Sequence, residues 1–401
     1  MKIKHILIKL TFYLMLLMFI KCEYDVTQPL WYKDYPELPI PSIVKIYPPE
    51  EATPGCNYIK IFGSNFVGKV SVYFDNVKAN VVSASNDSIV VRRPAISKDS
   101  CVVKVVCDSA MVVAKYSPYK IHKVIEPYGN FLENKQLNAV TVDDDENIYV
   151  VEKKINIYKI TSSGDKTIIG TANRIIYDIT IGFDNNLYLF ENNRAIDVLN
   201  LQTEEMTQWI KLKSGKVVKY GDFTSHGYLV TGGRRSGLVV VTPDKNPIYT
   251  DYYIKDEIIG IRVYNGYVYV NVICNEPDEN NPEFAIWRHS IDSKGNVGDK
   301  ELVLNLTNFT DQYFTDIDQI NSFYFSEDGR LFIGVSAENP LLVYDFNTQT
   351  MDFFYLGIVP SYCKYFAWGT QSYIYLIRGD NDLEEEWTMY RIDIGMNKGS
   401  K

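Results

Sequence analysis

The sequence is poor in histidine and in positive charge. Its 41 Lys and Arg residues are outnumbered by 50 Asp and Glu residues, which gives a formal charge of −9. Such a chain lacks the basic surface that wrapping a nucleic acid requires, so we expect no nucleic-acid partner. A metal site built on several histidines is also nearly excluded, because only four histidines occur: His5, His122, His226 and His289.

Long apolar runs are scarce as well. Leu10–Ile20 is apolar without a break and follows a basic start at Lys2, Lys4 and Lys9. This run has about the length of a signal-peptide core and is shorter than the roughly 20 residues of a membrane-spanning helix. Downstream we find no second run of 18 apolar residues. We therefore expect an exported chain that is otherwise soluble.

The end of this run decides how the chain is held. The stretch LLMFIKCEYD resembles a bacterial lipoprotein signal, residues 1–22, and implies lipid attachment at Cys22. The family pattern has a small residue before the cysteine, where this chain has Lys21. The alternative is an ordinary leader and cysteine in a periplasmic or secreted protein. Residues 23–39 belong to a proline-rich stretch, which predicts an extended tether.

Composition favours an all-β protein. Apolar residues make up 46% of the chain, which is enough for hydrophobic cores. Aromatic residues make up 14%, and 31 of them are tyrosines. Tyrosine suits a half-buried pleated surface, where its ring packs and its hydroxyl reaches water. The length of 401 residues predicts two or three domains.

Residues 40–121 predict the first domain. Runs such as SIVKIYP, NYIKIFGSNF, DSIVVRRP and CVVKVVC alternate or end at turn residues. About seven short strands in 80 residues are typical of an Ig-like sandwich. The spaced features Pro41, Pro48, Gly55, IKIFGSNF, VSVYFDNVKANVV and SIVVRRP resemble the IPT/TIG family. That resemblance implies a spacer or interaction module. Arg92 and Arg93 are interpreted as a solvated strand end.

The cysteines of this domain suggest one crosslink. Cys101 and Cys107 are six residues apart on one predicted strand, roughly 20 Å, which is too far to bridge. In an Ig-like strand order, Cys56 begins the second strand and Cys101 the sixth. We therefore predict a Cys56–Cys101 disulfide; the alternative is that all three are small buried hydrophobes.

Residues 122–397 repeat a short pattern in which a polar turn precedes a strand with a large apolar residue at its middle. The middle residues recur at intervals of 39, 41, 40, 63 and 43 residues: Tyr149, Tyr188, Leu229, Tyr269, Phe332 and Tyr375. Strand-like runs flank each of them. Four antiparallel strands about every 40 residues predict the blades of a six-bladed β-propeller. The repeat resembles NHL-type six-bladed propellers.

The repeat also predicts how the ring closes. No outer strand follows the last repeat, so Tyr119–Gly129 is expected to supply one and to cover the sheet edge. The longest interval carries about 20 extra residues, in Asn275–Glu283 and Asn305–Gln319. Such insertions are either functional loops or tolerated surface excursions.

Few residues point to chemistry. The acidic turns DDDEN, FDNN and SEDG predict hairpin turns rather than a metal site. Some six-bladed propellers are lactonases or lyases, but His226 and His289 need not meet. Arg194, in ENNR, and Arg234 and Arg235, in GGRRSG, lie in loops that rim one propeller face. They are candidates for gripping a carboxylate or sulfate; the alternative is a solvated loop.

The sequence therefore predicts an all-β protein with an Ig-like sandwich followed by a six-bladed β-propeller. We expect it at the cell envelope, at the outer membrane or cell surface. Its expected role is the non-catalytic binding of a polysaccharide or protein, with no cofactor and no metal. The alternative is a propeller hydrolase or lyase.

Overall fold

The computed structural model describes residues 38–131, 135–153, 155–310, 312–314, 320–380 and 383–401. In these ranges the regular structure is β-sheet apart from one 3-10 turn, η1 (Leu306–Phe309). None of the described residues belongs to a helix long and apolar enough to cross a membrane. The predicted leader, Cys22 and the tether up to residue 37 lie outside the described residues. The predicted all-β class is confirmed.

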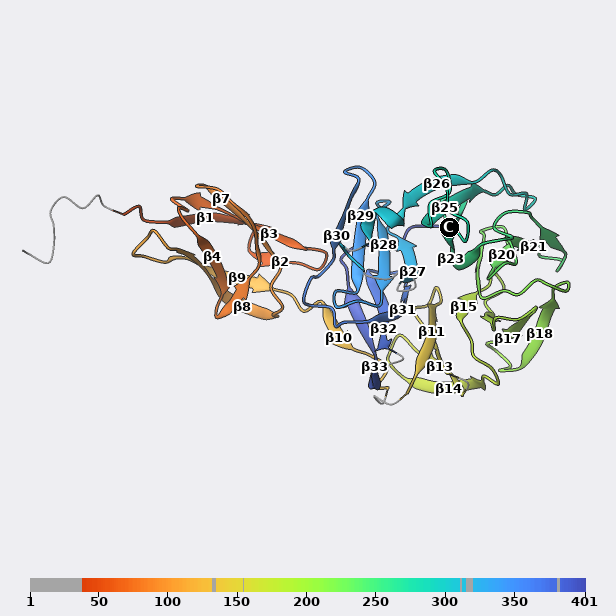
Figure 1. The fold of residues 1–401 in the computed structure, drawn as a ribbon. Helices are drawn as coiled ribbons and strands as arrows, with labels where there is room; N and C mark the ends of the chain where they lie inside the picture. Colours follow the sequence, from red (N-terminus) through yellow and green to blue (C-terminus); the bar gives the residue numbers. More distant parts are fainter. Residues whose placement is uncertain (1–37, 132–134, 154, 311, 315–319, 381–382) are drawn as a thin grey trace, which may run out of the picture. The chain divides into compact units, whose positions relative to one another are not determined.

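The first domain is a sandwich of two sheets (Figure 1). One sheet has the order β1 (Ser42–Tyr47), β3 (Tyr58–Ser64), β7 (Ser88–Arg92) and β6 (Val81–Ala84). The other has the order β2 (Glu51–Ala52), β9 (Ala114–Ile121), β8 (Lys98–Cys107), β4 (Val70–Phe74) and β5 (Val77–Ala79). Alternation along each strand builds the core, as in β3, where Ile59 and Ile61 are fully buried and Lys60 between them is exposed.

Arg92 and Arg93 do not form the solvated strand end that the sequence suggested. Arg93 is 3% exposed, and its guanidinium donates hydrogen bonds to the carbonyl oxygens of Ala52, Thr53 and His122 at 2.5–3.1 Å. Arg92 forms a 2.6 Å ion pair with Asp352. The expectation was wrong because Arg93 faces backbone carbonyl oxygens and Arg92 faces the Asp352 carboxylate instead of water.

The second domain consists of six four-stranded antiparallel sheets, the blades, arranged around a ring (Figure 1). Blade one contains β11 (Leu137–Val142), β12 (Ile148–Glu152), β13 (Asn156–Ile160) and β14 (Lys166–Thr171). Blade two contains β15 (Asp178–Ile181), β16 (Leu187–Phe190), β17 (Ala195–Leu199) and β18 (Met206–Lys211). Blade three contains β19 (Tyr220–Phe223), β20 (Leu229–Gly232), β21 (Val239–Val241) and β22 (Pro247–Tyr249).

The remaining blades repeat the arrangement. Blade four contains β23 (Glu257–Tyr264), β24 (Tyr267–Ile273), β25 (Phe284–Ser290) and β26 (Glu301–Asn305). Blade five contains β27 (Ile320–Phe325), β28 (Leu331–Val335), β29 (Leu341–Asp345) and β30 (Thr350–Phe353). Blade six contains β31 (Cys363–Trp368), β32 (Tyr373–Asp380), β33 (Leu383–Asp393) and β10 (Ile125–Pro127). All six large residues that mark the repeat lie buried on the second strand of their blade.

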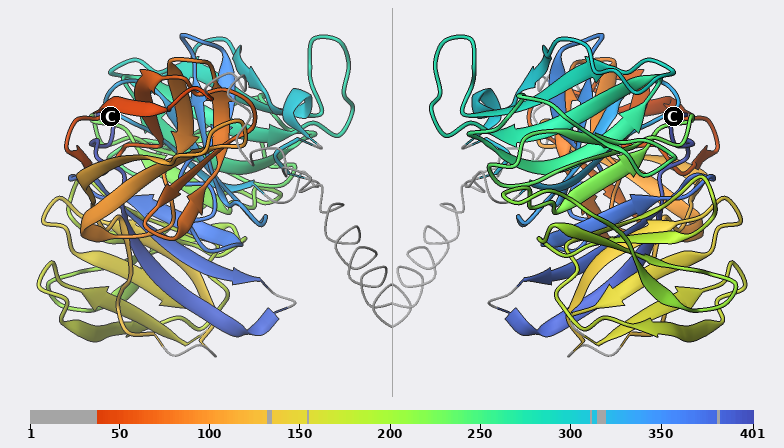
Figure 2. Two further views of the ribbon diagram at one scale, coloured as in Figure 1. Left: turned by 90° about the vertical axis from the view of Figure 1, so that its left-hand side faces the viewer. Right: turned by 90° about the vertical axis from the view of Figure 1, so that its right-hand side faces the viewer.

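The ring closes as the sequence predicts. β10, from the start of the domain, pairs antiparallel with β33 and completes blade six. A second tie joins the first turns of blades one and six, where the Glu146 carboxylate accepts hydrogen bonds from the backbone N–H groups of Thr370 and Gln371. Figure 2 shows blade one in yellow beside blade six in blue. Strands distant in sequence therefore pair in one blade and close the ring.

The extra residues of the longest repeat interval lie in two connections. Residues 274–283 join β24 to β25, and the segment after β26 contains η1. Asn305 caps η1 by accepting a 3.1 Å hydrogen bond from Thr307 N–H. Residues 311 and 315–319 lie outside the described residues. Both insertions fall where the sequence places them.

Candidate functional site

A cavity of about 250 Å³ lies inside the ring of innermost strands, and all six blades line it. Each blade contributes one residue at the same level of its first strand: Thr141, Thr180, Asp222, Arg262, Tyr324 and Ala367. These residues share a register, because each pairs with the middle of the second strand, as Thr141 pairs with Tyr149 and Thr180 with Tyr188. The repeat that builds the fold therefore also fixes which residues meet at its centre.

Three side chains of this region tie adjacent blades together. Asp178 Oδ2 accepts a 3.4 Å hydrogen bond from Gly221 N–H of the next blade, and Asp222 Oδ2 accepts a 2.9 Å bond from Val263 N–H. Ser322 Oγ accepts one from Phe366 N–H at 3.0 Å. The innermost strand is the edge of its sheet, so its N–H groups need partners from outside that sheet. These hydrogen bonds between blades explain why some of the polar side chains are buried there.

Arg262 has both a carboxylate and an aromatic ring beside it, Asp178 and Tyr324. Its Nη1 donates to Ile261 O at 2.7 Å and lies 3.4 Å from Asp178 Oδ2. Its guanidinium carbon lies 4.6 Å from the centre of the Tyr324 ring, within cation–π range. Among the described residues its buried Nε has no hydrogen-bond partner. Burial alone would lower the pKa of Arg262, but Tyr324 and the carboxylates raise it above its usual value.

The two aspartates differ in their titration. Burial raises the pKa of Asp178 to about 6, and Arg262 opposes that shift. Burial acts on Asp222 in the same direction, but Lys401 and Arg262 outweigh it and hold its pKa below the usual value. The surroundings therefore favour the charged form of Asp222, whereas burial favours the protonated form of Asp178, which does not line the cavity.

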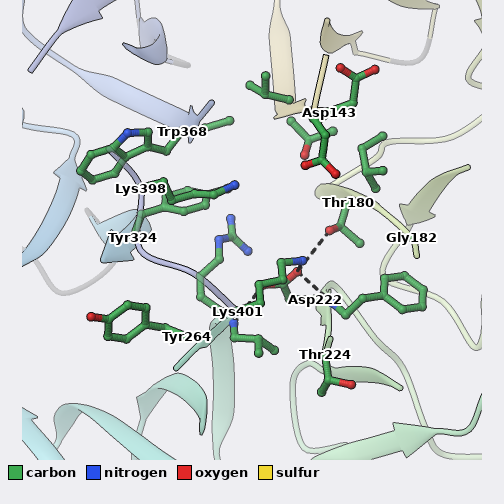
Figure 3. Close-up of a pocket in the computed structure, with 18 of the residues that line it drawn as sticks. Asp143, Thr180, Gly182, Asp222, Thr224, Tyr264, Tyr324, Trp368, Lys398 and Lys401 are labelled. Carbon is green, nitrogen blue, oxygen red and sulfur yellow. Dashed lines mark hydrogen bonds and ion pairs between the residues drawn. The ribbon is translucent and has the colours of Figure 1, made fainter. Parts of the chain in front are cut away.

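Residues 397–401, which we call the plug segment, cross the cavity. Gly399 N–H donates to Phe325 O at 2.8 Å, and Ser400 O accepts from Asn265 N–H at 2.9 Å. Lys401 Nζ lies 2.6 Å from Asp222 Oδ1, at the centre of Figure 3. Lys398 is half-buried, and burial, aided by the positive charge of Lys401, lowers its pKa to about 8. The plug segment thus brings two ammonium groups to the carboxylates.

The acidic turns at the cavity rim act as hairpin turns. Asp143 Oδ1 accepts hydrogen bonds from the N–H groups of Asp145 and Asn147, and the Tyr149 hydroxyl donates to Asp143 Oδ2 at 2.9 Å. Asp184 repeats the pattern in blade two. The turn interpretation is confirmed. No group of three or more His, Cys, Asp or Glu side chains among the described residues is arranged to hold a metal ion.

Neither candidate histidine lines the cavity. His226 is exposed in the first turn of blade three, beside the rim residue Ser225. His289 is fully buried in β25, where it is bonded to the Tyr253 hydroxyl at 2.7 Å and to Gly298 O at 2.9 Å. The two are not brought together at the cavity, so no histidine-based lyase site is assembled there.

The candidate arginines lie at the other end of the blades. Arg194, Arg234 and Arg235 are in loops between second and third strands, whereas the cavity rim is made by turns between first and second strands. In antiparallel strands these two sets of loops lie at opposite ends. Arg234 lies 3.8 Å from Glu257, and Arg235 N–H donates to Asp256 O. The proposed anion grip by these arginines stays a prediction, separate from the cavity.

The predicted Cys56–Cys101 disulfide is absent. Both residues are free thiols, as are Cys107 and Cys274. Cys56 Sγ donates to Tyr58 O at 3.1 Å, so its thiol turns toward the backbone at the start of β3. Cys101 is 2% exposed and packs in the core of the sandwich. The sequence argument matched strand levels but could not fix the direction of the side chains.

Sequence reasoning missed the residues that meet in the cavity, above all Asp222, Arg262, Lys398 and Lys401. One signal could have found the first two. Each hairpin leads back from the second strand to the innermost strand, where Arg262 lies opposite Tyr269 and Asp222 lies opposite Val230, the residue after Leu229. No local signal marks the two lysines, because they reach the cavity only after the ring has closed.

Comparisons with known proteins agree with this architecture. Residues 41–121 match the IPT/TIG domain family. No curated protein matches the chain. A protein of unknown function from Bacteroides thetaiotaomicron is similar in structure, with a TM-score of 0.52, 12% identity, and coverage of 90% of this chain and 99% of that one.

Two further structures are also similar. An auxiliary nutrient binding protein from Bacteroides thetaiotaomicron has a TM-score of 0.50 and 11% identity, and the match covers 91% of this chain and 99% of that one. A protein assigned as a gluconolactonase has a TM-score of 0.50 and 9% identity, with coverage of 69% and 94%. At these identities the likeness establishes the fold, an Ig-like domain with a propeller, and leaves binding and catalysis equally open.

Proposed function

We propose that this protein is an exported cell-envelope protein whose propeller binds a polysaccharide or protein ligand at the cavity mouth without catalysing a reaction. The IPT/TIG domain serves as a spacer, and a lipid on Cys22 holds the chain to the membrane. The observation that carries the proposal is the state of two of the three carboxylates that line the cavity. Asp143 and Asp222 each have their oxygens engaged by backbone N–H groups, a tyrosine or a lysine, and the third, Asp144, is exposed to solvent.

Catalysis would need a different arrangement. A general base has to reach a substrate proton with a free lone pair, and a nucleophile needs such a base beside it. Asp178, with a pKa raised to about 6 by burial, does not line the cavity and is bonded to Gly221 N–H and Arg262. The cavity instead combines hydroxyl and aromatic groups, including Thr224, Tyr264 and Phe183, as binding sites commonly do.

Binding is tested with the full mature chain, on a glycan array and by retention of components from an envelope extract. Phe183 is 59% exposed at the rim, so Phe183→Ser should weaken capture of the ligand about tenfold, as loss of an aromatic anchor does. Ile168 is 55% exposed on the outer strand β14 and does not line the cavity, so Ile168→Ser is the matched control. No retained ligand, together with turnover of a lactone, would overturn the proposal.

The anchor is tested separately. Labelling with a fatty acid should mark the wild-type chain and leave the Cys22→Ser variant unlabelled. Labelling of neither chain would exclude the lipid and leave a periplasmic or secreted protein, whereas equal labelling of both would place the lipid on a residue other than Cys22.

A further inference from the structure

The plug segment supplies the positive charge that the cavity otherwise lacks. The fixed side chains lining it carry three carboxylates and one guanidinium, and the plug segment adds two ammonium groups: Asp143, Asp144, Asp222, Arg262, Lys398 and Lys401. Three negative charges against one positive charge leave an excess of two, which the two lysines balance. Without these lysines the cavity would attract a cationic group.

Asp222 is where that attraction is strongest. The residue is 5% exposed, and apart from Arg262 and Lys401 its partners are neutral donors: Thr180 Oγ1 at 3.4 Å and the N–H groups of Phe223 and Val263 at 2.9 Å. A buried carboxylate is costly unless a cation accompanies it. The ammonium of Lys401, at 2.6 Å, provides that cation in direct contact.

The plug segment is bound as a short peptide would be. It uses peptide groups, with Gly399 N–H on Phe325 O and Ser400 O on Asn265 N–H, and it presents lysines on either side of a glycine. The glycine is needed because a Cβ on Gly399 would overlap the Tyr264 ring and come within 2.9 Å of Ser326 O. Glu327 holds the beginning of the segment through the Asn397 backbone and amide at 3.1 Å. These few contacts can be exchanged for identical ones from another chain.

We propose that the cavity is a docking site for an extended, lysine-bearing peptide segment of a partner protein. The plug segment occupies this site intramolecularly until the partner segment displaces it. The inference rests on the proposed binding function and selects a protein over a polysaccharide, because the groups now bound are a peptide N–H on Phe325 O, a peptide carbonyl on Asn265 N–H and a lysine ammonium on Asp222, all of which a lysine-bearing peptide supplies.

Tethering explains why the plug segment would mask the site. A segment joined to its site by a short linker competes at an effective concentration in the millimolar range. A free peptide therefore binds the wild-type chain weakly, and its apparent affinity rises once the competitor is removed. Gly399→Val displaces the plug segment sterically and leaves every charged residue of the chain unsubstituted.

The probe is a fluorescent peptide with the sequence of residues 396–401, MNKGSK, titrated onto the full chain while its anisotropy is followed. Gly399→Val should bind this peptide about tenfold more tightly than wild type or better. The matched peptide MNMGSM, which lacks the two lysine ammonium groups, should bind about tenfold more weakly than MNKGSK. Adding Asp222→Asn to Gly399→Val should reduce the affinity for MNKGSK to that for MNMGSM.

A second variant guards against misfolding of Gly399→Val. Lys398→Met with Lys401→Met keeps the glycine and the backbone contacts, and it should raise peptide affinity in the same direction. The control is Lys294→Met, an exposed lysine of the turn between β25 and β26, which should change nothing. Equal binding of the two peptides, or no gain in either plug variant, would overturn the inference. Displacement of MNKGSK by a glucosamine oligomer as effectively as by unlabelled peptide would overturn the choice of a peptide.

These outcomes are separable from a failure of the proposed function. If the chain retains an envelope ligand through Phe183 but MNKGSK does not compete with it, the binding function stands and this inference fails. If MNKGSK binds as expected while the chain retains no envelope ligand and turns over a lactone, this inference stands and the proposed function fails.

Discussion

Arg93 in the Ig-like domain and Arg262 in the propeller are both largely buried arginines, and their guanidinium groups have different kinds of partner. Arg93 donates to three neutral carbonyls and pairs with no carboxylate among the described residues. Arg262 lies among two carboxylates and a tyrosine ring. Burial lowers the pKa of Arg93, whereas the surroundings raise that of Arg262.

The difference teaches what each domain does with a buried charge. Arg93 joins two segments of backbone, residues 52–53 and 122, so its charge strengthens hydrogen bonds that hold the sandwich together. Arg262 holds negative charge in place around an open cavity. A clamp tolerates little change, whereas an electrostatic site can be rebalanced by changing its partners.

Removing the clamp should have the largest effect. Arg93→Met removes the charge-assisted hydrogen bonds to the carbonyl oxygens of Ala52, Thr53 and His122, and such bonds contribute more than neutral ones. We expect the Ig-like domain to lose about 3 kcal/mol of unfolding free energy. Urea unfolding of the full chain measures it, with the two domains expected to give separate transitions. Arg234→Met, at a site 65% exposed, should change stability by less than about 0.5 kcal/mol. Equal effects of the two substitutions on stability would refute the stabilising role assigned to Arg93.

Removing the propeller arginine should cost less and should be repairable. Arg262→Met leaves Asp178 buried without its cation, and we expect a loss of about 2 kcal/mol at pH 7.5. Adding Asp178→Asn should recover most of that loss, because the amide oxygen still accepts from Gly221 N–H and carries no charge. No neutralising partner exists for Arg93. Differential scanning calorimetry of the single and double variants decides; a double variant no more stable than the single one would contradict the electrostatic interpretation.

The stability of the folded chain should also depend on pH through Asp178. Burial raises the pKa of Asp178 to about 6 in the folded chain, above the value of about 3.9 expected when unfolded. The folded state therefore binds the extra proton between these values, and stability falls as pH rises from about 4 to about 6. A shift of about two pKa units corresponds to on the order of 3 kcal/mol.

The measurement is the difference between wild type and Asp178→Asn in urea unfolding at pH 4.5 and pH 7.5. Wild type should lose stability relative to the variant as pH rises. Asp99→Asn, whose side chain is 97% exposed, should show almost no such change. A wild type that gains stability relative to Asp178→Asn over this range would reverse the assigned direction of the shift.

The sequence predicts the propeller well and its cavity poorly, for a physical reason. Tyr149 and its equivalents mark hairpins that form between neighbours in sequence, so their spacing reveals six blades and the closing strand. The contact of Lys401 with Asp222 joins residues 179 positions apart and exists only in the closed ring. Arg93 was misjudged for a similar reason, because the carbonyls it binds belong to segments about 30 to 40 residues away.

The smallest effect concerns the cysteines of the Ig-like domain. If Arg93 joins residues 52–53 to residue 122, the domain has a polar clamp and needs no covalent one. Cys56 and Cys101 are free, and burial raises the pKa of the Cys101 thiol to about 11, which makes it a poor nucleophile for disulfide formation. A reductant should therefore shift the melting temperature by less than about 1 °C, since a lost disulfide typically costs 2–5 kcal/mol. Mass mapping that found Cys56 joined to Cys101, with a reductant-sensitive transition, would show that the sandwich relies on a covalent crosslink in addition to Arg93.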